Sequence, residues 1–262
     1  MKPNVVCSEV GSVAYLTLTG PRKNALAREM HHALAAQLDR LKDRADIEFI
    51  VLRGAGGVFS SGGDVTQLAD GLPESYVDDY MRRMEGTIGA MRQMDQIVIA
   101  AIEGAAIGAA AALALSADIV IAEEDAKIRL SFVRLGFVPD AGATYLLPRA
   151  VGGARASDLL MTGRWISVAE ACSAGLVSRS CEHGSISEAV EGVLDELRQS
   201  PPHALAMTKH LINRRDQTEF MAAVREEGES QPVAAALTSS DVADAVLNGV
   251  TRDPQPTGFV AT

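Results

Sequence analysis

Three short apolar segments, separated from one another by turns and by residues with helical periodicity, constrain the fold of this chain most strongly. Each segment has the length of a strand and is apolar almost throughout, so we predict three buried strands. Two other stretches, residues 25–41 before the first segment and residues 74–94 between the first and the second, place apolar residues at helical spacing and are predicted helices. The three predicted strands are Phe49 to Gly54, Ile97 to Ile102 and Asp118 to Glu123.

The order of these elements predicts how the chain is organised. Residues 12–20 alternate in polarity and residues 127–130 are similar but shorter, so both are also predicted strands. Beyond about Gly184 the strand signals stop and three consecutive helical segments follow. We therefore predict an α/β core over residues 1–200 and a helical C-terminal region over residues 201–262.

Composition and charge disfavour several classes of protein. The 262 residues are 47% hydrophobic and 22% charged, as in folded soluble proteins. The formal net charge is -10 and no basic run occurs, which disfavours nucleic-acid binding. We expect neither a signal peptide nor a membrane span, because no apolar segment is long enough. The three cysteines are widely spaced and lack a C-x-x-C motif, which favours the cytoplasm and no metal site.

Two glycine-rich turns are candidates for chemistry. The turn SSGGDV follows Phe59, and the turn EGAAIGA follows the predicted strand that ends at Ile102. A turn between a buried strand and a helix presents free backbone N–H groups. Two such groups that converge form an oxyanion hole, which stabilises an enolate or a tetrahedral oxyanion. Taken singly, either turn is also explained by the need of a tight turn for glycine.

A lone acid, Asp140, raises a second question. It lies in the segment RLSFVRLGFVPDAGATYLLPR, between a proline and a run of small residues. One interpretation is an N-cap of the helix that follows, which would contribute about 1 kcal/mol. The other is a proton carrier, because the apolar neighbours Phe132, Leu135, Phe137 and Val138 would raise its pKa. The dipole of the following helix would act in the opposite direction.

Five segments in fixed order resemble the enoyl-CoA hydratase/isomerase (crotonase) superfamily. They are PRKNALAREM, FIVLRGAGGVFSSGGDV, IVIAAIEGAAIGAAAALALSADIVIA, RLGFVPDAGATYLLPRAVG and MTGRWISVAEACSAGLV. The resemblance covers about residues 14–177 and is closest to the isomerase branches, which include 3,2-enoyl-CoA and ring-oxepin isomerases. It implies a crotonase-like spiral of ββα turns with a C-terminal helical region that forms a homotrimer or a dimer of trimers.

The same resemblance implies the ligand and the residues that contact it. The ligand is an acyl-CoA thioester, with CoA as part of the substrate and no permanently bound cofactor. Its carbonyl oxygen would accept hydrogen bonds from the backbone N–H groups of Gly63 and Ala109. The CoA moiety would contact the loop before the first predicted helix and the first glycine-rich turn. These expected CoA contacts are Arg22, Lys23, Ala25, Ser61, Gly62 and Asp64.

Two departures from the resemblance bear on the reaction. Hydratases of the superfamily activate water with two glutamates, and the matching positions here are Ala112 and Phe132. Neither side chain can carry a proton, so hydration is disfavoured. Asp140 matches the single acid of the isomerase branches and would move a proton from C2 to C4. The alternatives are a hydratase or lyase with an atypical acid such as Glu103, and a non-catalytic acyl-CoA-binding protein in which Asp140 only caps a helix.

Other reactive side chains carry less weight. His31 and His32 are expected to be solvated on the polar side of their helix. Ser60 and Ser61 lack the G-x-S-x-G context of a nucleophile and are expected to be turn residues. The walls of the acyl pocket are expected from residues 65–95 and from the C-terminal helices, and the acyl group itself is not predicted.

Overall fold

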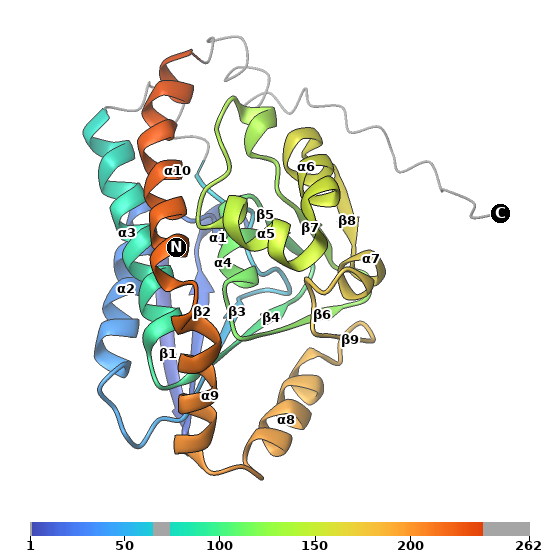
Figure 1. The fold of residues 1–262 in the computed structure, drawn as a ribbon. Coiled ribbons are helices and arrows are strands. Elements are labelled where there is room, and N and C mark those ends of the chain that lie inside the picture. Colours follow the sequence, from blue (N-terminus) through green and yellow to red (C-terminus); the bar gives the residue numbers. More distant parts are fainter. Residues whose placement is uncertain (1, 65–73, 238–262) are drawn as a thin grey trace, which may run out of the picture.

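The computed structural model of the chain describes residues 2–64 and 74–237 (Figure 1). Its central sheet contains strands β1 (Asn4–Val10), β2 (Val13–Thr19), β3 (Phe49–Gly54), β4 (Ile97–Ile102), β6 (Ile119–Glu123) and β9 (Arg179–Cys181). Their spatial order is β1-β2-β3-β4-β6-β9. β1 and β2 pair antiparallel, and the other neighbouring strands pair parallel. The predicted strands that became β2, β3, β4 and β6 are therefore confirmed.

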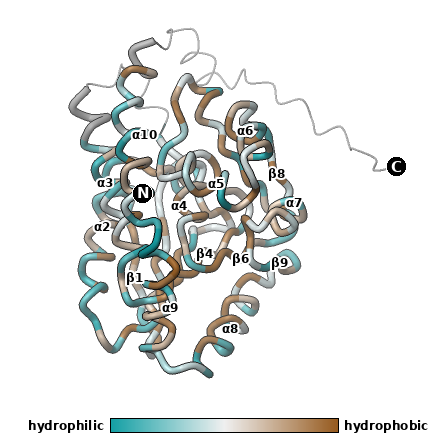
Figure 2. The backbone as a smooth tube through the Cα atoms, viewed as in Figure 1, coloured by the Kyte–Doolittle hydropathy of each residue, from teal (hydrophilic) through white to brown (hydrophobic). Residues whose placement is uncertain are grey.

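The central strands bury both of their faces, which explains why they are apolar almost throughout. Phe49 and Val51 of β3 pack on one face of the sheet against helix α8 (Ile186–Leu197). Ile50 and Leu52 point to the other face and join the main core. This alternation follows from the period of two residues along a strand. Figure 2 shows the hydrophobic colour concentrated along β4 and β6.

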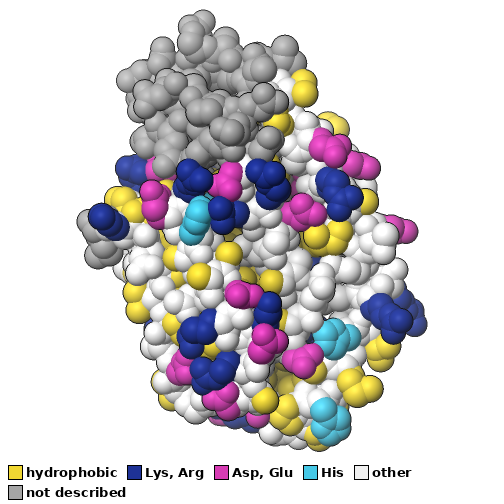
Figure 3. Space-filling view, turned by 90° about the vertical axis from the view of Figure 1, so that its left-hand side faces the viewer, with side chains coloured by type: hydrophobic (Ala, Val, Ile, Leu, Met, Phe, Trp, Pro, Cys, Tyr) yellow, Lys and Arg dark blue, Asp and Glu magenta, His cyan; other side chains and the backbone are white. Residues whose placement is uncertain are grey.

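Three long helices lie side by side on the main-core face of the sheet (Figure 1). The middle helix, α3 (Glu74–Gln93), contacts the other two, α2 (Arg28–Leu41) and α10 (Gln217–Leu237). Ion pairs also join them at the surface, where Arg28 contacts Asp79 at 3.1 Å and Arg225 contacts Glu85 at 3.7 Å. Figure 3 shows basic and acidic side chains interspersed on this side of the molecule.

A small second sheet and several short helices complete the fold. The sheet has the order β5-β7-β8, with β5 at Ala105–Ile107, β7 at Lys127–Arg129 and β8 at Trp165–Ser167. The prediction of a strand near residue 127 is thus confirmed. The remaining helices are α1 (Pro21–Asn24), α4 (Ala109–Leu115), a 3-10 helix (Phe132–Leu135), α5 (Ala143–Val151), α6 (Gly153–Thr162), α7 (Val168–Ser173) and α9 (Pro202–Arg214).

Some element boundaries differ from the prediction for identifiable reasons. Helix α2 begins at Arg28 and not at residue 25, because Leu26 pairs with Gly63 and its N–H donates to Gly62 O at 2.7 Å. The second glycine-rich turn contains β5, which is too short to have a period of its own. Strands β1, β8 and β9 were also not predicted, and β1 lies at the sheet edge with most of its side chains exposed or half-buried.

The expectation that His31 is solvated is wrong. Its side chain is buried, with 1% of the residue exposed, and its ring packs edge-on against Tyr80 at a centroid distance of 4.6 Å. The reason is that His31 falls at helical spacing with Leu34, Leu38 and Leu41, all of which are buried. The buried face of α2 thus includes a histidine, a residue type that is more often at the surface.

The C-terminal helices pack against the rest of the chain. Phe220 and Val224 of α10 belong to the main core. Lys209 of α9 is buried, and its Nζ atom lies 2.7 Å from both Asp118 Oδ2 and Gln96 O. The three predicted helices beyond Gly184 are confirmed as α8, α9 and α10. Residues 238–262 of the predicted C-terminal region lie outside the described residues. None of the described helices is both long and apolar enough to cross a membrane.

Candidate active site

The two glycine-rich turns lie against each other. Ser60 N donates to Ala105 O at 3.0 Å, and Ile107 N donates to Ser60 O at 3.2 Å. Gly62 has a φ of +88°, and a Cβ atom added to it would lie 2.4 Å from Ile107 O. This position therefore requires glycine for its backbone conformation and for the close approach of the two turns.

A left-handed loop supports the first turn from behind. Arg22, Lys23 and Asn24 all have positive φ angles, which asparagine adopts more readily than the other two. The Asn24 side chain stabilises the loop by donating to Ala55 O at 2.9 Å and to Val58 O at 2.8 Å. Three successive residues in this conformation are thus held in place by a buried amide side chain.

Side chains of the first turn bind this loop. Ser60 Oγ donates to Asn24 O at 2.7 Å, and Ser61 Oγ donates to Arg22 O at 2.7 Å. The Asp64 carboxylate forms an ion pair with the Arg22 guanidinium. Both serine hydroxyls are engaged by the backbone, as expected of turn residues.

The residues predicted to contact CoA form two groups. One group lines a cavity that lies between the two turns and residues 131–140, and the other belongs to the loop behind the first turn. In the second group only Ala25 is buried, and the two basic residues are exposed. The first group is Ser61, Gly62 and Asp64, and the second is Arg22, Lys23 and Ala25.

The two predicted oxyanion donors, Gly63 and Ala109, line the same cavity. Ala109 is the first residue of α4, where a backbone N–H has no acceptor within the helix. Within residues 2–64 and 74–237, neither of these N–H groups donates to a protein acceptor. Both amides are therefore available to an oxygen atom of a ligand.

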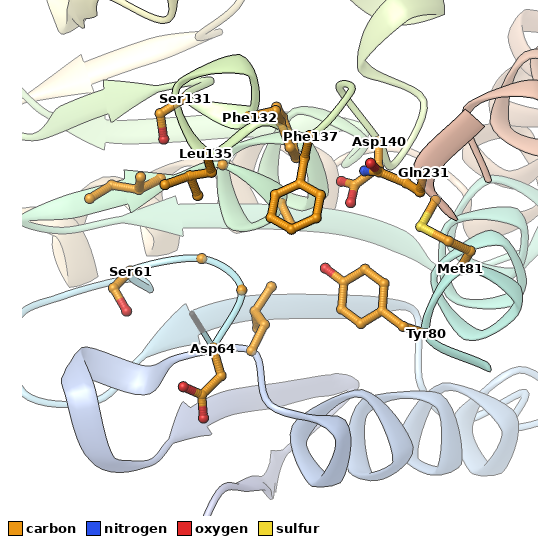
Figure 4. Close-up of a pocket in the computed structure, with 16 residues that line it drawn as sticks. Ser61, Asp64, Tyr80, Met81, Ser131, Phe132, Leu135, Phe137, Asp140 and Gln231 are labelled. Atoms are coloured by element: carbon orange, nitrogen blue, oxygen red, sulfur yellow. The ribbon is translucent and has the colours of Figure 1, made fainter. Parts of the chain in front are cut away.

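The cavity has a volume of about 130 Å³ and a largely apolar wall. Figure 4 shows Asp140 and Asp64 on opposite sides of it, with the rings of Tyr80 and Phe137 between them. The wall includes α3 and, through Gln231, α10, as predicted, while residues 65–73 lie outside the described residues. Its larger apolar and aromatic side chains include Leu26, Tyr80, Met81, Phe132, Leu135 and Phe137.

Asp140 lines this cavity and is almost fully buried, with 4% of the residue exposed. The side chain of Gln231 lies beside its carboxyl group and favours the ionised form. The Oδ1 atom has no hydrogen-bond partner in the described part of the chain. An unpartnered buried oxygen at a cavity wall is costly for folding and suits a group that a ligand contacts.

The interpretation of Asp140 as a helix N-cap is wrong. Helix α5 begins after Gly142, which has a left-handed φ of +78°, and Asp140 contributes no side-chain cap. Glu227 of α10 takes that role. Its Oε2 atom accepts from Gly142 N at 2.7 Å, and its Oε1 atom accepts from Thr144 N at 2.8 Å. The helix terminus therefore stabilises the negative charge of Glu227 and leaves Asp140 free.

The two neighbouring carboxyl groups have different surroundings. Burial raises the pKa of Asp140 well above its ordinary value, and the charge of Glu227 raises it further, against a smaller effect of Gln231. Burial also raises the pKa of Glu227, but hydrogen bonds from Thr144 and Gly142 oppose the shift. Asp140 is thus the carboxyl group suited to hold a proton, and Glu227 the one suited to stay ionised.

The positions that carry glutamates in hydratases remain without an acid. Ala112 is buried within α4, with 1% of the residue exposed, and Phe132 presents an aromatic ring to the cavity. Glu103 follows β4 and is not among the described residues that line the cavity. Burial, followed by the charge of Glu123, raises the pKa of Glu103.

One cluster that the sequence did not indicate lies apart from the cavity. His183 Nδ1 lies 3.2 Å from both Glu123 Oε2 and Asp125 Oδ2. The His183 and Asp125 side chains are 78% and 60% exposed, whereas Glu123 is buried and also accepts from Gly184 N at 2.7 Å. Pairing of two exposed side chains around one structural carboxylate explains this arrangement.

Sequence reasoning expected the C-terminal helices in the cavity wall but missed the two polar residues, Glu227 and Gln231, that α10 places around Asp140. Phe220, Val224, Glu227 and Gln231 follow one another at helical spacing, and all four are buried. The pattern therefore contains a signal, because two polar residues continue an apolar stripe. Without the fold, nothing in the sequence pairs that stripe with Asp140, which lies 87 positions before Glu227 by residue number.

Comparisons with known proteins agree with this architecture. The sequence matches the model of one protein family, Enoyl-CoA hydratase/isomerase, over residues 8–243. The Bacillus subtilis (strain 168) protein YhaR, whose name assigns it to the enoyl-CoA hydratases/isomerases, is 35% identical over 213 residues, which are 77% of this chain and 79% of YhaR. The 1,2-epoxyphenylacetyl-CoA isomerase of Escherichia coli (strain K12) is 33% identical over 206 residues, covering 77% of this chain and 78% of that protein.

A solved structure supports the same fold. The crystal structure of an enoyl-CoA hydratase from Mycobacterium avium subsp. paratuberculosis K-10 matches with a TM-score of 0.84 at 26% identity. The match covers 92% of this chain and 98% of that chain. The predicted crotonase-like α/β fold with a C-terminal helical region is therefore confirmed.

Proposed function

We propose that this chain, which belongs to the enoyl-CoA hydratase/isomerase family, is an acyl-CoA isomerase that shifts a double bond next to a CoA thioester. The observation that carries the proposal is the buried Asp140 carboxyl, whose Oδ1 atom has no hydrogen-bond partner in the described part of the chain, on the wall of a cavity that the backbone amides of Gly63 and Ala109 also line. We propose no resident cofactor, because CoA arrives as part of the substrate.

The proposed reaction uses three groups. The N–H groups of Gly63 and Ala109 bind the thioester oxygen and stabilise the enolate that forms on it. Ionised Asp140 removes a proton from C2 of a 3-enoyl thioester, which delocalises the electron pair into the enolate. The same carboxyl returns the proton at C4, and the double bond moves to C2–C3. A raised pKa suits this role, because it makes the carboxylate a stronger base and keeps the captured proton bound.

Hydration is the main competing reaction, and several relatives have hydratase names. Syn addition of water needs one group to orient water and a second to deliver a proton. Here Ala112 and Phe132 occupy the two glutamate positions, and Asp64 is held in an ion pair with Arg22. A single free carboxyl therefore favours proton transfer over addition of water.

The cavity wall also bears on how the acyl group is bound. The aromatic rings of Tyr80, Phe132 and Phe137 line the described part of that wall. We therefore propose that these rings contact the acyl group of the substrate.

The test is a panel of 3-enoyl, 2-enoyl and ring-bearing CoA esters, followed by proton NMR in deuterated water. We expect double-bond shift with deuterium entering at the α or γ carbon. The Asp140→Asn variant should lose this activity and still bind CoA esters, while a control variant at an exposed acid, Asp158→Asn, should keep it. Unchanged turnover in Asp140→Asn would refute the proton-carrier role. Efficient gain of water by a 2-enoyl ester would favour a hydratase, and binding without any turnover would favour a non-catalytic protein.

We also propose a trimeric or hexameric assembly in the cytoplasm. Met207, Leu211 and Ile212 of α9 are 62%, 64% and 69% exposed, which suits a face that a second subunit covers. Cys7, Cys172 and Cys181 are all free thiols, which suits a reducing compartment.

A further inference from the structure

Asp140 is held between two side chains of α10. Gln231 binds the residue that lies two positions before Asp140, since its Nε2 donates to Val138 O at 2.8 Å and its Oε1 accepts from Val138 N at 3.1 Å. Glu227 binds the residues that follow, through Gly142 N and Thr144 N. One turn of a single helix thus fixes the backbone on both sides of the acid.

We infer that Glu227 is a positioning residue for Asp140, because its carboxylate caps α5 in place of Asp140 and leaves the Asp140 carboxyl protonatable and facing the cavity. This inference rests on the proposed function only for the statement that Asp140 carries the proton of the reaction. The geometry itself is independent of the reaction.

The position of Glu227 gives it a charge that Asp140 senses. It is buried, with 5% of the residue exposed, and two backbone N–H groups and the Thr144 hydroxyl stabilise its ionised form. A fixed negative charge beside a second buried carboxyl disfavours ionisation of that second group. Glu227 thus caps α5 in place of Asp140. If Asp140 were the cap, the helix N-terminus would lower its proton affinity, whereas the charge of Glu227 raises it.

Few other charged groups face Asp140 in the described part of the chain. From α10 there are Glu227 and the polar Gln231. From α3 there is the Tyr80 hydroxyl, and across the cavity lies Asp64, whose charge is balanced by Arg22. No described basic side chain is among the groups that act on the Asp140 carboxyl. Glu227 is therefore the charge whose removal should most change the titration of Asp140.

The test is infrared difference spectroscopy of the full-length protein without substrate. The C=O stretch of the protonated Asp140 carboxyl is obtained by subtracting the spectrum of Asp140→Asn, and it is followed as a function of pH. We expect its titration midpoint to move to lower pH in Glu227→Gln, by on the order of one unit, a tenfold change in proton affinity. The acid limb of the pH–rate profile should move in the same direction.

Two further variants keep the inference falsifiable. Glu219 lies on the same helix, and its carboxylate binds Arg149 and Tyr145. Glu219→Gln should therefore leave the titration midpoint of Asp140 unchanged. Gln231→Leu removes the group that favours ionised Asp140 while the Glu227 cap remains, so the midpoint should rise.

Several outcomes would overturn the inference. They are an unchanged midpoint in Glu227→Gln, an equal shift in Glu219→Gln, and, should Glu227→Gln fail to fold, a Gln231→Leu midpoint that does not rise. A loss of thermal stability without any change in midpoint would make Glu227 a structural cap only, and would also overturn it. Because the spectroscopic titration needs no turnover, failure of the proposed isomerase activity would leave its result intact.

Discussion

Replacement of Gly62 by alanine tests whether the contact between the two turns is what creates the site. The added Cβ would lie 2.4 Å from Ile107 O, whereas carbon and oxygen atoms in contact need about 3.4 Å. Because the obstructing atom belongs to the backbone, the turns must separate by about 1 Å. A displacement of this size costs roughly 100-fold in rate, and loss of one oxyanion donor costs roughly 100- to 1,000-fold. We expect kcat/KM to fall within that range.

The strain of a positive φ must be separated from this displacement. Gly56 has a φ of +70°, similar to the +88° of Gly62, but a Cβ atom at Gly56 would meet nothing within 4 Å. Gly56→Ala should therefore lose about 1–2 kcal/mol of stability from backbone strain while keeping its rate. The assay combines urea unfolding of both variants with α-proton exchange of a CoA ester in deuterated water. A folded Gly62→Ala variant whose exchange rate lies within threefold of that of Gly56→Ala would refute the reasoning.

The remaining predictions concern pH and assembly. Burial lowers the pKa of His31 to about 4, against about 6.5 in an unfolded chain. The unfolded state therefore takes up a proton that the folded state does not, and the free energy of unfolding should fall by about 2 kcal/mol between pH 7 and pH 5. Urea titrations should show this loss in the wild type and not in His31→Gln; an equal loss in both would exclude His31 as its source. For assembly, Leu211→Asp should lower the mass measured by sedimentation velocity, and an unchanged trimer or hexamer would exclude α9 from the interface.

The parts of the fold that sequence predicts are those with a long, regular signal. Strands β3 and β4 were predicted because both of their faces are buried, so that residues 49–52 and 97–102 are apolar without interruption. Helix α3 was predicted from an apolar stripe that includes Met84 and Ile88. Strand β5 was missed because its three residues are stabilised by contacts with the first turn and with β7, which no local pattern reveals.

The site divides in the same way. The turns around Gly63 and Ala109 and the position of Asp140 follow from local sequence and family resemblance, and the structure brings them to one cavity. The local sequence favoured a cap at Asp140, because a proline, an acid and small residues precede a helix. That interpretation failed because Glu227, far along the chain, competes for the same backbone N–H groups and binds them. The prediction that His31 is solvated failed for a similar reason, since the ring that covers it is Tyr80 of another helix.

The contribution of α10 has a consequence for biosynthesis. A ribosome that has translated as far as α9 has already produced both turns, Asp140 and α5. The carboxylate that caps α5 and the amide that binds Val138 emerge only afterwards, at residues 227 and 231. A nascent chain, or a product of early termination, that ends before α10 would thus lack both of the side chains that hold the segment around Asp140.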